Sequence, residues 1–519
     1  MEEKEKIQQT NQNEQGERED LQNKKLASRL IPWKTADYVR TISWFTIHTL
    51  LFVLGYVLVL FVNAKFDTQA VLDFIRQDGK VEDIVYLIVA TCLISLTIFV
   101  YFYNENRDFL YESKNINLIF IVLEICIAIS FGVGKFMVYF RPFALCALLS
   151  LLLMDKRTAI FMNAISCFLT FMIDAFLSDV LGSRTLYATL LIGFLTSVLA
   201  VYLVHKTSSR IKVFLMGFVI AIPLIISILC FEFSTMIQNP VIFILAGFTS
   251  GMLSVVLMMA ILPILERLFN KVTDYRLFEI TDHKAPLLSR LRKEAPGTFN
   301  HCLIVSTLVE SCAGAIGENA LLARACAYYH DVGKLKRPEF FTENQSGYNP
   351  HNEIPPELST DIIRSHATDG EDIIKEYRLP SILGEVAVQH HGTMPITYFY
   401  MKASKFSEST LDIDKYSYVG PKPQSKIAAI VMIADACEAK ARADGKRSHP
   451  DVDKIVCDII QDRIARNQLD ECNLTFKEIE IIRQTIVNAL SGVHHDRVKY
   501  PKLVVGGDKY EGQISKKEN

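Results

Sequence analysis

The sequence lacks closely spaced cysteine pairs, an excess of charge of either sign, and any concentrated basic stretch. Its 11 cysteines are scattered, with no Cys-x-x-Cys pair, as expected of reduced thiols rather than of a disulfide scaffold. The formal net charge is −2, from 55 Lys and Arg against 57 Asp and Glu. Because no basic stripe is present to neutralise phosphates, we predict that the protein binds neither DNA nor RNA.

The start of the chain also lacks the pattern of a cleaved signal peptide. The first apolar run begins only after about 40 polar residues, and it is too long for a signal h-region. Residues 1–40, rich in Glu, Lys, Gln and Asn, are therefore predicted to form a disordered tail, and residues 504–519 a second polar tail.

Hydrophobic residues make up 50% of the chain and are concentrated before residue 266. A helix needs about 20 apolar residues to cross a hydrocarbon core of ~30 Å. Residues 41–265 are therefore predicted to be a transmembrane helical block with about eight spans. The windows are 41–63, 84–103, 116–134, 137–154, 159–181, 186–204, 211–231 and 241–265.

Basic residues alternate between the predicted loops and indicate the orientation of the block. If the amino terminus is inside, the inner segments hold most of the Lys and Arg residues, as the positive-inside rule requires. Between the first two spans lies only a short outer loop, 64–83, which is too small to be a ligand-binding domain. We expect a multi-pass protein of the plasma membrane with both termini, and everything after residue 266, in the cytoplasm.

Two ionisable residues, Glu124 and Asp174, fall inside predicted spans. Such residues are costly in hydrocarbon, so they mark either a functional polar site or an internal pair. The alternative is that each lies near a span end and reaches the interface. The sequence leaves both interpretations open.

After a juxtamembrane linker, 266–296, the pattern is almost wholly helical over 297–503. The apolar spacing is typical of a helical bundle of one domain. The predicted fold class is therefore all-α: a multi-span membrane block followed by a cytoplasmic helical bundle.

The bundle contains an ordered series of histidines and aspartates in otherwise apolar or small-residue helical contexts. A lone histidine there would most often be a satisfied core residue, but seven potential ligands favour a metal site. Imidazole and carboxylate suit iron, manganese or zinc, and seven ligands are too many for one ion. The series is His301, His330, Asp331, His366, His390, His391 and Asp435.

The order H…HD…D resembles that of the HD-domain metallo-phosphohydrolases. A closer resemblance is to the seven-transmembrane HD proteins, the PgpH-type cyclic-di-AMP phosphodiesterases. It depends on APGTFNH (295–301), YYHDVGK (328–334), NPH (349–351), SHATDG (365–370), HHGT (390–393), GPKPQSK (420–426) and ADACEA (434–439).

This resemblance implies a two-metal phosphodiesterase that opens cyclic di-AMP to linear pApA. It implies that His301, His330, Asp331 and Asp435 hold one ion, with Fe or Mn expected. Asp331, His366, His390 and His391 then hold the other, so that Asp331 bridges the two ions. Lys334 is expected to clamp the phosphate or to protonate the leaving oxygen. His351 resembles a family loop position near the site.

The chain departs from the family pattern in one respect, because such proteins carry a large extracellular domain after the first span. Control by an external ligand is therefore in doubt. A homodimer is compatible with the resemblance. The doublet His494-His495 lies outside the matched series and is interpreted as structural.

Three alternatives stay open. Cyclic-di-GMP hydrolysis is one, although His390-His391 is followed by Gly-Thr-Met-Pro and no Gly-Tyr-Pro signature is present. A one-metal nucleotidase would leave His366, His390 and His391 without a role. A receptor that only binds nucleotide would be expected to lose ligands, and all seven are present.

Overall fold

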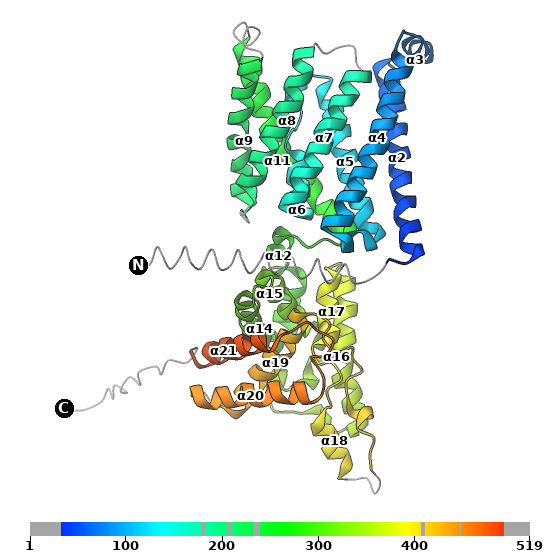
Figure 1. Ribbon diagram of the computed structural model, residues 1–519. Helices are drawn as coiled ribbons and strands as arrows, with labels where there is room; N and C mark the ends of the chain where they lie inside the picture. The colour runs from blue at the N-terminus through cyan, green and yellow to red at the C-terminus, as the bar shows by residue number, and fades with distance from the viewer. Residues whose placement is uncertain are drawn as a thin grey trace, which may run out of the picture. The chain divides into compact units, whose positions relative to one another are not determined.

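The computed structural model describes residues 33–492, apart from 178–182, 206, 208–209, 232–238, 406–409 and 446–447. Over these residues the chain is helical, with one isolated β-bridge between Pro395 and Ser417 and no strand (Figure 1). The all-α fold class is thereby confirmed. Most of the predicted amino-terminal tail, the carboxy-terminal tail and the His494-His495 doublet lie outside the described residues.

The chain forms two compact units, each described by itself. The first contains the residues up to Pro286 together with Lys375–Ser381, and the second contains the rest. Helices of the first unit are α2 (Thr35–Asn63), α3 (Thr68–Ile75), α4 (Lys80–Glu105), η1 (Arg107–Tyr111), α5 (Ser113–Gly134), η2 (Val138–Phe140), α6 (Leu145–Leu153), α7 (Lys156–Leu177), α8 (Ser183–Val204), α9 (Arg210–Phe231), α11 (Pro240–Phe269) and α12 (Asp274–Ile280).

Within the described ranges, seven helices are long and apolar enough to cross a bilayer: α2, α4, α5, α7, α8, α9 and α11. The protein is therefore a multi-pass membrane protein. The eighth window predicted from the sequence, 137–154, contains η2 and the short α6. It lies between Lys135, which hydrogen-bonds to Asn63 at the end of α2, and Thr158, whose hydroxyl lies 3.3 Å from that of Tyr101 in α4. The window therefore crosses the block as a broken helix, so the predicted number of crossings stands. With nine residues, α6 rises only about 14 Å, less than half of the hydrocarbon thickness.

The backbone between α5 and α6 is irregular, and serines of α11 supply some of its hydrogen bonds. The Ser250 hydroxyl donates to the carbonyl of Arg141. The amide of Ala144 donates to Ser254 Oγ at 3.3 Å. Irregular backbone is tolerated at membrane depth only where protein or water satisfies its polar groups. Here α11 does so.

Both ionisable residues predicted inside spans are paired within the membrane block. The Asp174 carboxylate receives two hydrogen bonds from the Arg141 guanidinium, and both side chains are 4% exposed. Glu124 Oε1 lies 2.8 Å from Nδ1 of His48, whose Nε2 contacts Asn117 Oδ1 at 2.9 Å. Of the interpretations left open above, the structure supports internal pairing.

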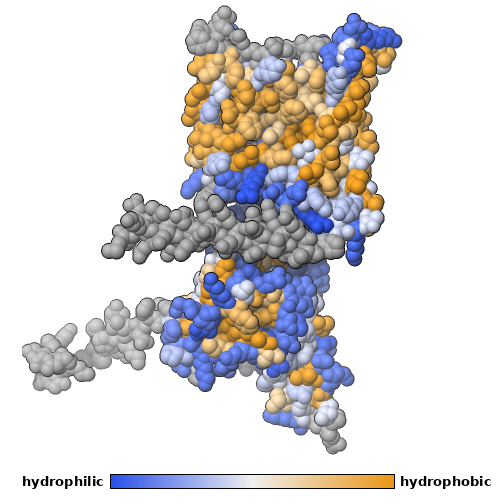
Figure 2. Space-filling view, in the orientation of Figure 1, coloured by the Kyte–Doolittle hydropathy of each residue, from blue (hydrophilic) through white to orange (hydrophobic). Residues whose placement is uncertain are grey.

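Large apolar side chains cover the outside of the membrane block. On α2, for example, Leu50 and Leu54 are 63% and 64% exposed. Figure 2 shows this hydrophobic surface over the long helices, with hydrophilic residues gathered towards the helix ends. An exposed apolar surface of this extent is what a lipid-facing surface requires.

The second unit is a helical bundle that surrounds the ligand series. Its helix α14 packs against α15, α19 and α21, and α19 also packs against α20. Side chains in the core, such as Val309, Ile430 and Ile482, are fully buried. Helices of this unit are α13 (Pro286–Glu294), α14 (Pro296–Ala315), α15 (Ala320–Tyr329), η3 (Val332–Lys336), η4 (Pro338–Phe340), η5 (Thr342–Asn344), η6 (Pro350–Asn352), α16 (Pro356–Glu376), α17 (Ser381–Gln389), α18 (Thr397–Ser404), η7 (Ile413–Tyr416), α19 (Lys426–Asp444), α20 (His449–Ala465) and α21 (Phe476–Gly492).

Candidate metal centre

The first predicted ligand, His301, lies near the beginning of α14. Pro296 occupies the first turn of this helix, where its missing N–H costs nothing. The Asn344 carboxamide accepts hydrogen bonds from the amides of Gly297 at 2.9 Å and Thr298 at 3.2 Å. An otherwise unpaired helix terminus is thereby capped from a separate loop, which fixes the start of the helix that carries His301.

The His330-Asp331 pair lies where α15 ends and η3 begins. Gly333 follows, and α16 approaches it so closely that a Cβ atom there would lie 1.9 Å from the carbonyl oxygen of His366. The absence of a side chain at this position brings the His366 helix against the doublet. This explains the glycine of the His-Asp-Val-Gly-Lys motif in packing terms.

Three of the histidines are oriented in the same way. The Nδ1 atoms of His330, His366 and His390 each lie within 2.7 Å of the carbonyl oxygen three residues earlier in the chain. Because a carbonyl can only accept, each Nδ1 must carry the proton. In the neutral ring, Nε2 is then the nitrogen whose lone pair a metal ion would bind.

The two carboxylate oxygens of Asp331 face different histidines. Oδ2 lies 3.3 Å from Nε2 of His330 and 3.6 Å from Nε2 of His301. Oδ1 lies 3.3 Å from Nε2 of His366 and 3.7 Å from Nε2 of His390. A carboxylate so placed has one oxygen for each of two sites.

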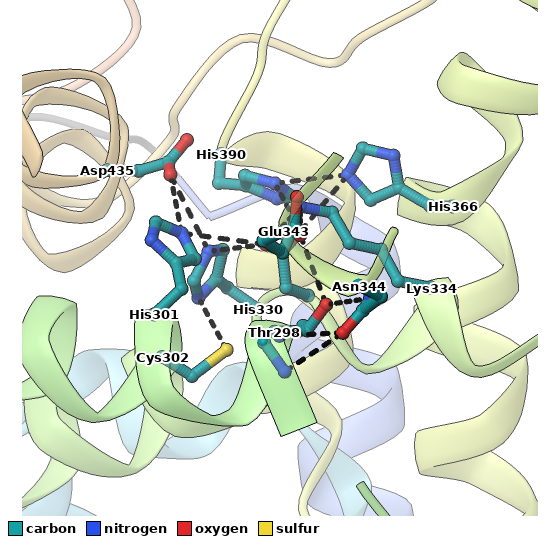
Figure 3. Close-up of polar contacts among 12 residues, drawn as sticks. Thr298, His301, Cys302, His330, Lys334, Glu343, Asn344, His366, His390 and Asp435 are labelled. Carbon is teal, nitrogen blue, oxygen red and sulfur yellow. Dashed lines mark hydrogen bonds and ion pairs between the residues drawn. The ribbon is translucent and has the colours of Figure 1, made fainter. Parts of the chain in front are cut away.

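Asp435, in the middle of α19, completes the cluster. Its Oδ1 lies 2.9 Å from Nε2 of His301 and 3.9 Å from Nε2 of His330. Its Oδ2 lies 4.0 Å from Nδ1 of His391. Figure 3 shows the rings of His301, His330, His366 and His390 converging with Asp435 from separate helices.

All seven predicted ligands therefore come together. Ligand atoms of Asp331, His366, His390 and His391 lie within 4.8 Å of one another, as do those of His301, His330 and Asp331. Nε2 of His330 and Oδ1 of Asp331 are buried without a hydrogen-bond partner, which is costly unless a ligand compensates. The donor set, with its orphaned atoms, fits divalent metal binding.

Two of the histidines, His301 and His330, lie among carboxylates that favour their protonated forms. Burial opposes charge on His301, but hydrogen bonds to Asp435 and Glu438 raise its pKa to about 10. Burial likewise opposes charge on His330, yet the charge of Asp331 raises its pKa well above the usual value. For Asp331, Lys334 and His330 overcome burial and hold the pKa well below its ordinary range.

In the other three histidines, His366, His390 and His391, the pKa is lowered instead. Burial, reinforced by the charge of His330, lowers the pKa of His390 to about 3. Burial also lowers the pKa of His366, and burial with the charge of His390 lowers that of His391 well below its usual range. These rings are therefore neutral, as metal ligands must be, across the physiological pH range.

Two glutamates that the sequence did not predict complete the surroundings of the site. Glu438 Oε2 lies 2.6 Å from Nδ1 of His301, on the side of the ring opposite Asp435. Glu343 Oε1 lies 2.8 Å from the ammonium of Lys334. Glu438 follows Asp435 by three residues on one helix, a spacing that could have indicated it. Glu343 comes from a loop whose sequence gives no periodic signal.

Lys334 lies beside the cluster, as predicted. Its ammonium is 2.7 Å from Asp331 Oδ2, and its side chain is 13% exposed. Burial opposes the charge on Lys334, but Asp331 and Glu343 together raise its pKa. The ammonium is therefore charged at every physiological pH.

A cavity of about 540 Å³ opens onto the cluster. Lys334 and five of the predicted ligands, His301, Asp331, His366, His391 and Asp435, reach its wall, and so does His351. Its aromatic side chains are Phe340, Phe341, Tyr398, Phe399 and Tyr418. The cavity therefore combines a candidate metal centre, a fixed cation and flat apolar surfaces.

Comparison with known families divides the chain as the fold does. Residues 83–273 match the family model described as 7TM receptor with intracellular HD hydrolase. Residues 298–440 match the model of the HD domain. The second match begins three residues before His301 and ends five residues after Asp435, so it encloses the whole ligand series.

Two curated relatives match most of the chain. The cyclic-di-AMP phosphodiesterase PgpH of Bacillus subtilis (strain 168) is 34% identical over 431 residues, covering 80% of this chain and 60% of the relative. PgpH of Listeria monocytogenes serotype 1/2a (strain 10403S) is 35% identical over 365 residues, covering 69% of this chain and 50% of the relative. The chain thus spans between half and three fifths of the length of these relatives.

Among solved structures, the crystal structure of the L. monocytogenes PgpH HD domain is 44% identical, with a TM-score of 0.39, and covers 40% of this chain and 99% of that one. The crystal structure of the same domain in complex with cyclic di-AMP is 43% identical, with a TM-score of 0.40. The match covers 41% of this chain and 100% of that one. From the family models and the curated relatives, we conclude that the chain belongs to the family of 7TM receptors with an intracellular HD hydrolase.

Proposed function

We propose that this protein is a membrane-anchored, metal-dependent phosphodiesterase that hydrolyses cyclic di-AMP to linear pApA. Two curated relatives that are 34% and 35% identical bear the name cyclic-di-AMP phosphodiesterase. Because the chain spans only part of their length, the activity and its substrate are proposals for this protein.

The geometry of Asp331 is the observation that carries the proposal. Its Oδ2 faces the His301 and His330 side and its Oδ1 faces the His366 and His390 side, each at 3.3–3.7 Å from an imidazole nitrogen. A single carboxylate between two imidazole sets favours a two-metal centre over a one-metal nucleotidase. That arrangement also gives His366 and His390 a role that the one-metal alternative does not.

The proposed ligand sets are those expected from the sequence. One site would take His301, His330, Asp331 and Asp435, and the other Asp331, His366, His390 and His391. We propose iron or manganese because the set is rich in imidazole and lacks thiolate. Bound there, two divalent ions would neutralise phosphodiester charge and lower the pKa of water to give a nucleophile at neutral pH.

The other residues of the cavity would bind and orient the substrate. We assign to Lys334 the neutralisation of a non-bridging phosphate oxygen, since its ammonium is permanently charged and lines the cavity. Tyr418, whose ring stacks on His391 with centroids 4.2 Å apart, gives a flat surface beside the centre. Such rings favour the stacking of a purine base.

Hydrolysis of cyclic di-AMP and cyclic di-GMP, measured side by side, tests the function. The full chain, purified in detergent and loaded with Mn²⁺ or Fe²⁺, is expected to produce pApA, and Asp331→Ala is expected to abolish turnover. Faster hydrolysis of cyclic di-GMP would show that the protein is a cyclic-di-GMP phosphodiesterase instead. Metal binding without turnover of either dinucleotide would overturn the proposal in favour of a binding-only receptor or another phosphate substrate.

The remaining proposals concern the state of the protein in the cell. We place both termini and the HD domain on the cytoplasmic side, from the distribution of Lys and Arg among the loops. A homodimer and the absence of DNA or RNA binding stay predictions. Light scattering of the detergent-solubilised chain tests the first, and a filter-binding assay tests the second.

A further inference from the structure

Lys334 shares one oxygen of Asp331 with the histidines of the first proposed metal site. Its ammonium lies 2.7 Å from Oδ2, the same oxygen that faces His301 and His330. If that oxygen serves a metal ion, as proposed above, the ammonium needs a second carboxylate to hold it at the cavity wall. Glu343 is such a carboxylate, at 2.8 Å.

Glu343 is itself fixed from the other side. The Thr298 hydroxyl donates to Glu343 Oε1 at 3.1 Å and accepts from the Asn344 amide at 2.9 Å. Thr298 is fully buried and the Glu343 side chain is 10% exposed. Figure 3 shows the row from Lys334 through Glu343 to Thr298 and Asn344, beside the histidine cluster.

The loop that carries Glu343 is held by close packing as well as by hydrogen bonds. A Cβ atom on Gly297 would lie 1.9 Å from the Glu343 carbonyl oxygen, so only glycine allows the loop to approach α14 so closely. The same helix carries His301. The η5 segment that carries Glu343 is therefore packed directly against the helix that carries His301.

We propose that Glu343 is a positioning residue, which holds the Lys334 ammonium at the cavity wall beside Asp331, so that its charge meets the substrate phosphate. This inference rests on the proposed phosphodiesterase function. It assigns to Glu343 no metal and no contact with the reacting atoms. Its effect should therefore pass through Lys334 alone.

A double-mutant cycle tests this dependence. At saturating Mn²⁺, Glu343→Gln in the full chain is expected to lower kcat/KM for cyclic di-AMP about tenfold, mainly through kcat, with unchanged metal content. In a Lys334→Ala background the same substitution is expected to change kcat/KM less than twofold. Equal losses in the two backgrounds, or loss of a metal ion from Glu343→Gln, would overturn the inference.

Matched variants separate positioning from damage to the loop. Glu339→Gln changes an exposed glutamate of the same loop and is expected to leave kcat/KM unchanged. Thr298→Val removes only the hydroxyl that fixes Glu343 and is expected to lower kcat/KM about threefold, again only when Lys334 is present. If Glu343→Gln does not fold, the Thr298→Val variant in the presence and absence of Lys334 tests the same dependence.

A binding measurement keeps this test independent of the proposed reaction. Inorganic phosphate is titrated calorimetrically into the Mn²⁺-loaded wild type, into the three variants of the cycle and into the control variants. Glu343→Gln should weaken phosphate binding only where Lys334 is present. If the wild type hydrolyses neither dinucleotide, the proposed function fails, and the phosphate titration alone decides on Glu343.

Discussion

His301 faces carboxylate oxygens with both ring nitrogens, Asp435 at 2.9 Å and Glu438 at 2.6 Å. Its pKa of about 10 in the metal-free protein lies above physiological pH, so the ring is protonated there. A metal ion can bind Nε2 only after the Nε2 proton has left, whereas the Nδ1 proton can stay on the ring and be donated to Glu438. Glu438 thus selects the tautomer that binds metal.

We therefore predict that Mn²⁺ binding at pH 7.5 releases about one to two protons per chain, from His301 and His330. Calorimetric titrations in buffers of different ionisation enthalpy measure this number directly. Glu438→Gln should lower the pKa of His301 and hence the number of protons released. The same binding enthalpy in every buffer would contradict the prediction.

The convergence of the seven candidate ligands could be predicted from the sequence because each belongs to a local motif of distinctive residue types. Lys334 was predicted for the same reason, since it follows the His-Asp doublet within one turn. Glu343 was not, because its role depends on a loop folding back onto Thr298, 45 residues earlier. Contacts of that kind leave no periodic pattern in the sequence.

At the level of elements, the approach of η3 to α16 leaves no room for a side chain at Gly333. We predict that Gly333→Ala destabilises the protein by about 3 kcal/mol or more, because the clash is with backbone that cannot rotate away. Thermal unfolding of the detergent-solubilised chain should show a markedly lower apparent Tm, together with weakened Mn²⁺ binding.

Gly314→Ala is the matched control. Gly314 is an exposed residue of α14, and a Cβ there would make only an ordinary contact with Ala320 at 3.7 Å. Alanine in a helix is favoured over glycine by up to about 1 kcal/mol, so this variant should be as stable as the wild type or more stable. If both variants behaved alike, the packing argument for Gly333 would be wrong.

The ion pair between Arg141, the residue after η2, and Asp174 of α7 leads to a prediction for the membrane block. Asp174→Asn leaves the buried Arg141 guanidinium without its counter-charge, which costs about 3–5 kcal/mol where a buried pair is broken. The fraction of protein that stays monodisperse after heating, measured by size exclusion, should fall. Arg141→Met combined with Asp174→Leu should recover much of the loss, and no recovery would argue against an ion-pair origin.

The membrane elements were predictable from length and hydropathy, except between α5 and α6. The window 137–154 is apolar enough to predict one continuous helix, yet Arg141 and Pro142 interrupt it and α6 starts only at Leu145. Hydropathy averages over such a break. The partners that stabilise it, Ser250 and Ser254, lie about 110 residues further along the chain.

For the whole molecule, the distribution of basic residues predicts which ends of the helices face the cytoplasm. An alkaline phosphatase fused after Asp78, between α3 and α4, should be active because it is exported. The same enzyme fused after Asp155, between α6 and α7, should be inactive. Reciprocal results with β-galactosidase fusions are the control, and an active fusion after Asp155 would reverse the predicted orientation.

The short α6 also bears on how the protein is made. Arg141 and Ala144 emerge from the ribosome long before Ser250 and Ser254 of α11, so their backbone groups lack these serine partners while the intervening helices are synthesised. Lipid cannot satisfy those groups. We therefore expect the α5–α6 region to reach its final hydrogen bonding only after α11 has been synthesised and packed against it.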